Sequence, residues 1–182
     1  MVKFIGISKI WYGPTMTTAP SASSLKTLLA GGTLTEVTNS HEGTWGYSQE
    51  DPNTTDYINE LTGKPYHRDK VSDGKKIITW TSGEYDYADK AALQGGSTVT
   101  ESSTVVGYAG GSADFISKCV IAKTKTGNYI VFTNADIVAK ADTQERAIGL
   151  GVTATALENP NSTVSSPIAD EYWFSGSAVD TV

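Results

Sequence analysis

The acidic pair Glu84 and Asp86 is the first place in this sequence where two side chains could do chemistry together. On one strand, residues two apart share a face, with about 6.6 Å between their Cα atoms. That separation is near the spacing of the two carboxylates in glycoside hydrolases. However, Asp86 stands where a helix N-cap is expected, with Asp89 three residues later in a variant of the capping box. We therefore predict turn and cap roles, and a hydrolase that uses Glu84 stays as an alternative.

The histidines and the cysteine form no familiar metal-binding or nucleophilic pattern. His41 and His67 are the only histidines and Cys119 is the only cysteine, too few for a zinc site of known spacing. Cys119 lies among apolar residues of a predicted strand, which is the setting of an inert thiol. The segment after Asp51 begins like a calcium loop, but Asp56 occupies the position that requires glycine. The sequence thus predicts no catalytic centre, no metal site and no cofactor.

The composition indicates one β-rich domain. The chain has 182 residues, of which 38% are apolar, and it is rich in Thr, Ser and Gly. This mixture is typical of many short strands joined by turns and argues against a helical bundle. The formal net charge of −6 argues against a surface that binds nucleic acid by neutralising phosphates.

Nothing in the sequence predicts secretion or membrane insertion. The amino-terminal residues lack the apolar run of a signal peptide, and no segment approaches about 18 consecutive apolar residues. A single cysteine cannot form an intramolecular disulfide, which fits synthesis in a reducing compartment.

Two short helices and many strands are expected. Residues 77–80 are β-branched and aromatic, as in a strand, and are followed by a helix that Asp86 caps and Gly95-Gly96 ends. Another helix is expected around residues 25–29, behind serines that can cap it. The predicted fold is mainly β: a β-sandwich or a partly closed β-barrel with one or two short flanking α-helices, in a single domain over residues 1–182.

The strongest predicted strand pair covers residues 115–123 and 129–135. A tight hairpin at residues 124–128 joins them, with Gly127 at positive φ. Both strands carry nearly continuous apolar runs, which indicates that both of their faces are covered. We expect the domain's own core on one face and something else on the other.

Residues 50–74 are expected to form a long polar loop that contacts another subunit. The segment is rich in turn residues, and a structureless loop of this length is uncommon in a compact domain unless it has a function. Its embedded apolar residues indicate that it docks on a partner. These residues are Tyr57, Ile58, Leu61 and Tyr66.

Exposed aromatic residues leave a second class of function open. Trp45 lies between Gly43 and Gly46, close to Tyr47, and is the best candidate for an exposed ring. Tryptophans of this kind form sugar-stacking platforms in carbohydrate-binding modules, but they are equally typical of cores and interfaces. The alternative is therefore a carbohydrate- or cell-surface-binding β-sandwich module. The carboxy-terminal extension, residues 159–182, is aromatic enough to pack on the domain or on a neighbour.

Two blocks of the sequence resemble the phage major tail tube protein family. The first is the polar segment 50–74, followed by IITW at 77–80, GEYD at 83–86 and the helix that ends at Gly95-Gly96. The second runs from KTKTG at 123–127 through YIVFTNA at 129–135 to AIGL at 147–150 and TATAL at 153–157. The resemblance covers residues 36–158.

The resemblance implies a structural protein without catalytic activity. Subunits of this family form hexameric rings whose inner sheets join into a continuous β-barrel, and the rings stack into a conduit for DNA. The implied partners are further copies of the chain, other tail proteins and DNA that passes without specific binding, with no membrane. The implied location is the virion tail, assembled in the host cytoplasm. The residues expected at the subunit interface are Trp45, Tyr47, Tyr57, Ile58, Leu61, Tyr66, Tyr129 and Val131.

Overall fold

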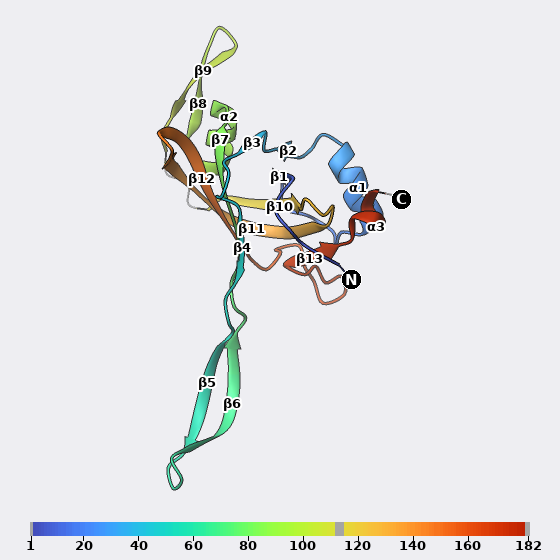
Figure 1. The fold of residues 1–182 in the computed structure, drawn as a ribbon, viewed down its shortest axis with the longest axis vertical. Coiled ribbons are helices and arrows are strands. Elements are labelled where there is room, and N and C mark those ends of the chain that lie inside the picture. Colours follow the sequence, from blue (N-terminus) through green and yellow to red (C-terminus); the bar gives the residue numbers. More distant parts are fainter. Residues whose placement is uncertain (1, 112–114, 181–182) are drawn as a thin grey trace.

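A computed structural model of the protein describes residues 2–111 and 115–180 (Figure 1). The fold is mainly β, as the composition predicts, and the described residues form three short helices where the sequence predicted one or two. The strands are β1 (Lys9–Gly13), β2 (Thr35–Glu36), β3 (Asn39–Ser40), β4 (Gly46–Gln49), β5 (Asn53–Asn59), β6 (Lys64–Ser72), β7 (Lys76–Glu84), β8 (Ser97–Glu101), β9 (Thr104–Ala109), β10 (Ser117–Lys123), β11 (Tyr129–Gln144), β12 (Ala147–Ala156) and β13 (Glu171–Phe174). The helices are α1 (Ala22–Ala30), α2 (Tyr87–Gln94) and α3 (Gly176–Asp180).

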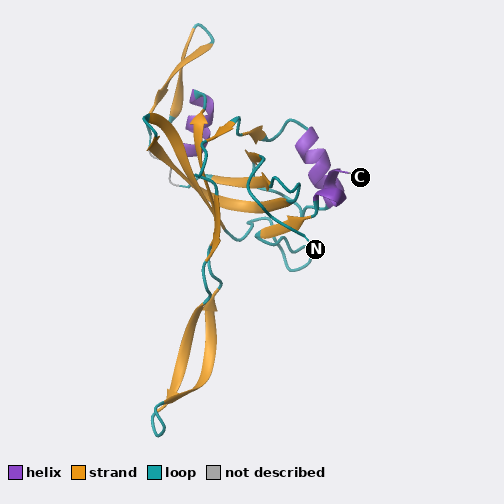
Figure 2. Cartoon of the chain, in the orientation of Figure 1, coloured by secondary structure: helices purple, strands orange, loops and turns teal. Residues whose placement is uncertain are grey.

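Nine of the strands form one antiparallel sheet with the order β2-β1-β10-β11-β12-β7-β3, to which β13 and β4 are added. The two other strand pairs, β5–β6 and β8–β9, form separate hairpins that project from opposite ends of the body (Figures 1 and 2). The described residues contain no closed barrel, and their arrangement is consistent with a β-sandwich with short helices.

The 16-residue strand β11 belongs to both halves of the sandwich-like body. One half contains β10 and β13, which pair with its first residues, and the other contains β12, which pairs with its later residues. The register with β10 shifts so that Thr133 and Asn134 together lie opposite Cys119, which is a β-bulge of the kind that bends a strand. The sequence predicted a strand over residues 129–135; the structure continues it through the bulge to Gln144.

Two apolar clusters lie on opposite faces of β1, β10 and the start of β11. The larger cluster fills the space between the two halves of the body and includes Trp80, Phe132 and Leu150. The smaller cluster lies on the other face and includes Leu25 from α1 and Val179 from α3. The prediction that both faces of this strand pair are covered is confirmed, and the chain itself covers both.

The local signals that predicted the helices are confirmed. The Asp86 side chain accepts a hydrogen bond from the Asp89 backbone N–H at 2.7 Å, and Gly95 ends α2 with φ of +83°. For α1, Ser21 is the serine that caps, since its side chain accepts from the Ser24 backbone N–H. The hydroxyl of Tyr12 donates to the Asp89 carboxylate at 2.5 Å, which ties the cap of α2 to strand β1.

Candidate assembly surface

The most exposed element of the molecule is the β5–β6 hairpin, which we call the arm. Figure 1 shows it extending away from the body. All residues of β6, and all of β5 except Asn59, are exposed. The expectation of a polar loop over residues 50–74 is wrong in this respect, because the segment pairs as a regular antiparallel hairpin with two register shifts. The two strands are held together by backbone hydrogen bonds, and neither face of the hairpin is buried. Polar residues can therefore occupy both faces of the strands.

The tip of the arm holds a leucine on a hydrogen-bonded turn. The Leu61 backbone N–H donates to the Asn59 side-chain oxygen at 2.9 Å, and the Gly63 N–H donates to the Asn59 carbonyl at 2.8 Å. Gly63 has φ of +64°, which glycine adopts without strain. The side chain of Leu61 is 96% exposed, so the turn presents an ordered apolar side chain to solvent.

One ion pair and one ring contact link the two strands of the arm. Arg68 donates to both carboxylate oxygens of Asp56, at 2.5 and 2.8 Å, and this holds the pKa of Asp56 below its usual range. His67 lies 2.7 Å from Asp69 and packs against the ring of Tyr57, with 5.7 Å between ring centroids. Exposed pairs of this kind contribute little to stability, so the arm depends mainly on its backbone hydrogen bonds.

The sequence-predicted contact residues of segment 50–74 all lie on the arm. Tyr57, Ile58 and Tyr66 are 44%, 51% and 71% exposed, and Leu61 is at the tip. Val71, which is 67% exposed, lies near the base of the arm and was not predicted. The structure therefore brings these apolar side chains together on one projecting element.

Trp45 and Tyr47 lie in the body beside the base of the arm rather than on it. Both are half-buried, and the Tyr47 hydroxyl donates to Glu171 at 2.8 Å. Burial, followed by this hydrogen bond, raises the pKa of Tyr47 well above its ordinary value. The rings of Tyr47 and Phe4 pack edge-on against Trp173, and together with Trp45 they line a cavity of about 320 Å³.

The expectation that Tyr129 and Val131 contact another subunit is not supported by their position. They are 2% and 0% exposed, in the cluster that α1 and α3 cover. The Tyr129 hydroxyl also donates to Asp180 of α3 at 2.8 Å. The apolar run in β11 predicts that a second face of the strand is buried. We expected a neighbouring subunit to bury it, but helices α1 and α3 of the same chain do so.

One edge of the later part of β11 has no strand partner among the described residues, a feature that the sequence did not reveal. The Ile137 N–H donates to the Ile116 carbonyl at 2.9 Å on the side where β10 pairs. Beyond that point, residues 138–144 pair with β12 on the other edge, and no described strand pairs with the β10-side edge. An unpaired edge can accept another strand.

The residues considered for catalysis have different structural roles. Asp86 caps α2, while Glu84 ends β7. Cys119 is fully buried, and burial raises its pKa to about 11, so the thiol is protonated at neutral pH. Within the described residues, no three His, Cys, Asp or Glu side chains are grouped as metal ligands.

Comparison with known proteins gives no relative on which to base a function. No protein-family model matches the chain, and no curated protein matches it. None of the helices formed by the described residues has the length and apolar character needed to span a bilayer.

Proposed function

We propose that this protein is a structural subunit that assembles with copies of itself into stacked rings, as a tail-tube-like conduit for DNA. The observation that carries the proposal is the arm, whose strands of 7 and 9 residues are exposed on both faces. An isolated two-stranded hairpin is at best marginally stable in water. An arm of this length with apolar side chains along it fits an element whose cover comes from a neighbouring copy.

The open edge of β11 supports contact within a ring. A strand from an adjacent copy can pair with residues 138–144 by β-strand addition, which satisfies the unpaired backbone groups there. Repeated around a ring, such pairing joins the sheets of successive subunits. This contact and the arm involve different surfaces of the chain, and contacts between unlike surfaces generate rings or open stacks.

The electrostatics support passage of DNA rather than binding. The chain has a net charge of −6, and such a surface does not bind phosphates by counterion release. We assign the conduit face to the outward side of β7, β12 and the end of β11. A shallow cavity of about 260 Å³ there is lined by Thr79, Thr81 and Thr153 and has one basic and one acidic side chain, Lys140 and Asp142.

Negative-stain electron microscopy of the concentrated protein tests this proposal. The comparison variant replaces residues 53–72 with the turn sequence Asn-Gly. The new turn joins the two chain segments at the base of the arm, where the Glu50 N–H donates to the Lys75 carbonyl. We expect rings or tubes from the unaltered protein, and a folded, unassembled body from the variant. Persistent tubes from the variant would contradict the role of the arm, and a protein that stays monomeric at high concentration would contradict the function.

The aromatic cavity beside β4 favours one alternative, a carbohydrate-binding module. The rings of Phe4, Trp45, Tyr47 and Trp173 surround it, and Trp173 is 43% exposed, so a sugar could stack there. Glycan-array binding by a monomeric protein, lost on Trp45→Ala, would favour this alternative over assembly.

A further inference from the structure

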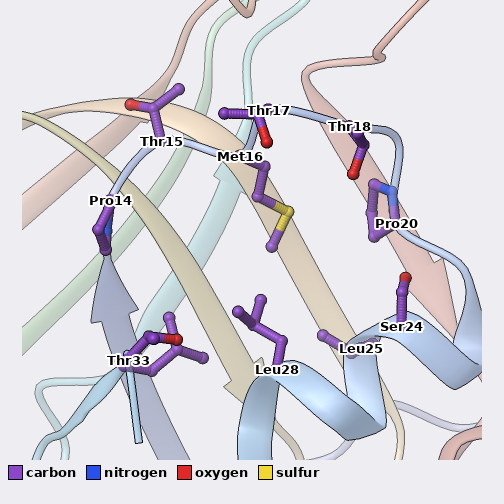
Figure 3. A pocket seen from close by; sticks show the side chains of 11 residues that line it. Pro14, Thr15, Met16, Thr17, Thr18, Pro20, Ser24, Leu25, Leu28 and Thr33 are labelled. Carbon is purple, nitrogen blue, oxygen red and sulfur yellow. The ribbon is translucent and has the colours of Figure 1, made fainter. Parts of the chain in front are cut away.

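A second apolar feature lies beside α1, far from the arm. The loop after β1 and the first half of α1 enclose a cavity of about 340 Å³ (Figure 3). Its floor is formed by Met16, Leu25 and Leu28, with Pro14 and Pro20 at its sides, and Met16 points into it from the loop. The remaining lining residues are threonines, a serine and Leu34, and none of the eleven is charged. The cavity is therefore suited to an uncharged, apolar side chain.

The tip of the arm offers a side chain of the matching chemistry. Leu61 is almost fully exposed on a turn that two hydrogen bonds hold in place, so little conformational entropy is lost when it is buried. We propose that Leu61 of one copy inserts into the cavity between Met16, Leu25 and Leu28 of another copy. This inference rests on the proposed assembly and specifies the surface that receives the arm.

The charges around the two surfaces are also complementary. Helix α1 has no acidic residue in its first turn, so the partial positive charge of its N-terminus is not offset by its own sequence. Ser24 of that first turn lines the cavity. Glu60 precedes Leu61 at the tip, so the inserted segment carries a charge of the sign that a helix N-terminus favours.

The contact must form between copies. In Figure 1 the arm and α1 extend in different directions from the body, so the tip cannot reach its own cavity. The two surfaces differ, which makes the contact head-to-tail. A single leucine and its turn bury a small area, so each contact is weak and becomes effective when many are formed together in a ring or stack.

Cross-linking between two separately prepared proteins tests the inference. One carries Thr62→Cys, an exposed position beside Leu61 that leaves the leucine in place, and the other carries Thr18→Cys, an exposed position on the cavity lining. The native Cys119 is fully buried, so a short bismaleimide should react at the introduced thiols. Val164→Cys, a fully exposed position outside the cavity lining, replaces Thr18→Cys in the control. We expect a cross-linked dimer of the chain only in the Thr62–Thr18 mixture, under conditions where assembly is seen by microscopy.

A second variant pair measures the contribution of the tip to assembly. Leu61→Asp should raise the concentration needed for assembly at least about tenfold, whereas Val71→Asp near the base of the arm should change it by less than about threefold. Assembly without the Thr62–Thr18 cross-link would overturn the cavity as the receiving site and leave the proposed function intact. Absence of assembly in the unaltered protein would overturn both.

Discussion

The arm and the β10–β11 hairpin are both antiparallel strand pairs, but their surroundings are opposite. In the β10–β11 hairpin, residues 119–122 and 129–132 are all buried, with the larger cluster on one face and α1 and α3 on the other. In the arm, only Asn59 is even partly buried. The same backbone arrangement is therefore stabilised by side-chain packing in one region and mainly by its own hydrogen bonds in the other.

This difference separates residues that maintain the fold from residues available for contact. Buried apolar side chains each contribute about 1.5–3 kcal/mol, while substitutions at exposed positions usually change stability by less than about 0.5 kcal/mol. Changes in the β10–β11 hairpin should therefore affect the monomer, and changes in the arm should affect only assembly.

The largest expected difference in stability comes from making the same substitution, isoleucine to alanine, once in each hairpin. Ile121 is 0% exposed in β10, and Ile58 is 51% exposed in the arm. Ile121→Ala should lower the free energy of unfolding by about 2–5 kcal/mol, because it leaves a cavity beneath α1. Ile58→Ala should change it by less than about 0.5 kcal/mol. Urea denaturation of the monomer measures both, and equal losses would show that the arm packs on something within the chain.

The buried polar group at the bulge gives the next largest expected effect. Asn159 is 1% exposed, and its amide donates to the Met16 carbonyl at 2.9 Å and to the Thr133 carbonyl at 3.4 Å. Asn159→Ala should cost about 1–3 kcal/mol, because these buried carbonyls lose a donor. Asn53→Ala, which removes an exposed hydrogen bond to Ser72 in the arm, is the matched control and should have little effect. A neutral Asn159→Ala in urea denaturation would contradict the role of this network in holding the bulge.

Features that depend on residues close together in the sequence were predictable, and features that depend on distant residues were not. The capping box of α2 and the turn that contains Gly127 are set by residues a few positions apart, and both were predicted and are confirmed. The cover over Tyr129 and Val131 comes from α1 and α3, whose residues lie about 100 positions before and 50 positions after β11. No local pattern identifies such a partner, so the burial was predicted and its source was not.

The sequence predicted segment 50–74 as a region of contact, which stays a prediction, but it did not predict the hairpin. Burial of one face normally gives a strand its alternating pattern, and the arm buries neither face, so its sequence resembles a loop. The open edge of β11 was missed for a different reason. Thr133 and Asn134 interrupt the apolar run, and only the register shows that they form a bulge within one long strand.

Backbone strain in the turns gives a smaller expected effect. The arm places Gly63 at φ of +64°, whereas the turn between β11 and β12 places Arg146 at +75°. A non-glycine residue in this left-handed region costs about 1–2 kcal/mol. Arg146→Gly should therefore raise the melting temperature by about 2–4 °C, as measured by thermal unfolding. Lys125→Gly, in a turn where this residue has no positive φ, is the control, and an equal rise there would contradict the explanation by strain.

The pH dependence of stability should also differ between the buried and exposed hairpins. The folded chain raises the pKa of Cys119 from 9.0 to about 11 by burial. The unfolded chain therefore loses this proton first, and the stabilisation, complete below pH 9, is lost as the pH rises to about 11. Cys119→Ala should reduce the alkaline loss of stability over this range in urea denaturation at a series of pH values. An unchanged pH profile would contradict burial of the thiol in the native state.

The central claim is that the arm is completed only by another copy of the chain. Hydrogen–deuterium exchange on dilute monomer and on assembled protein, compared peptide by peptide, tests it most directly. We expect amides of β10 and β11 to be protected in both samples, and those of β5 and β6 to exchange quickly in the monomer and become protected on assembly. An arm already protected in the monomer, or still unprotected in the assembled protein, would contradict the claim.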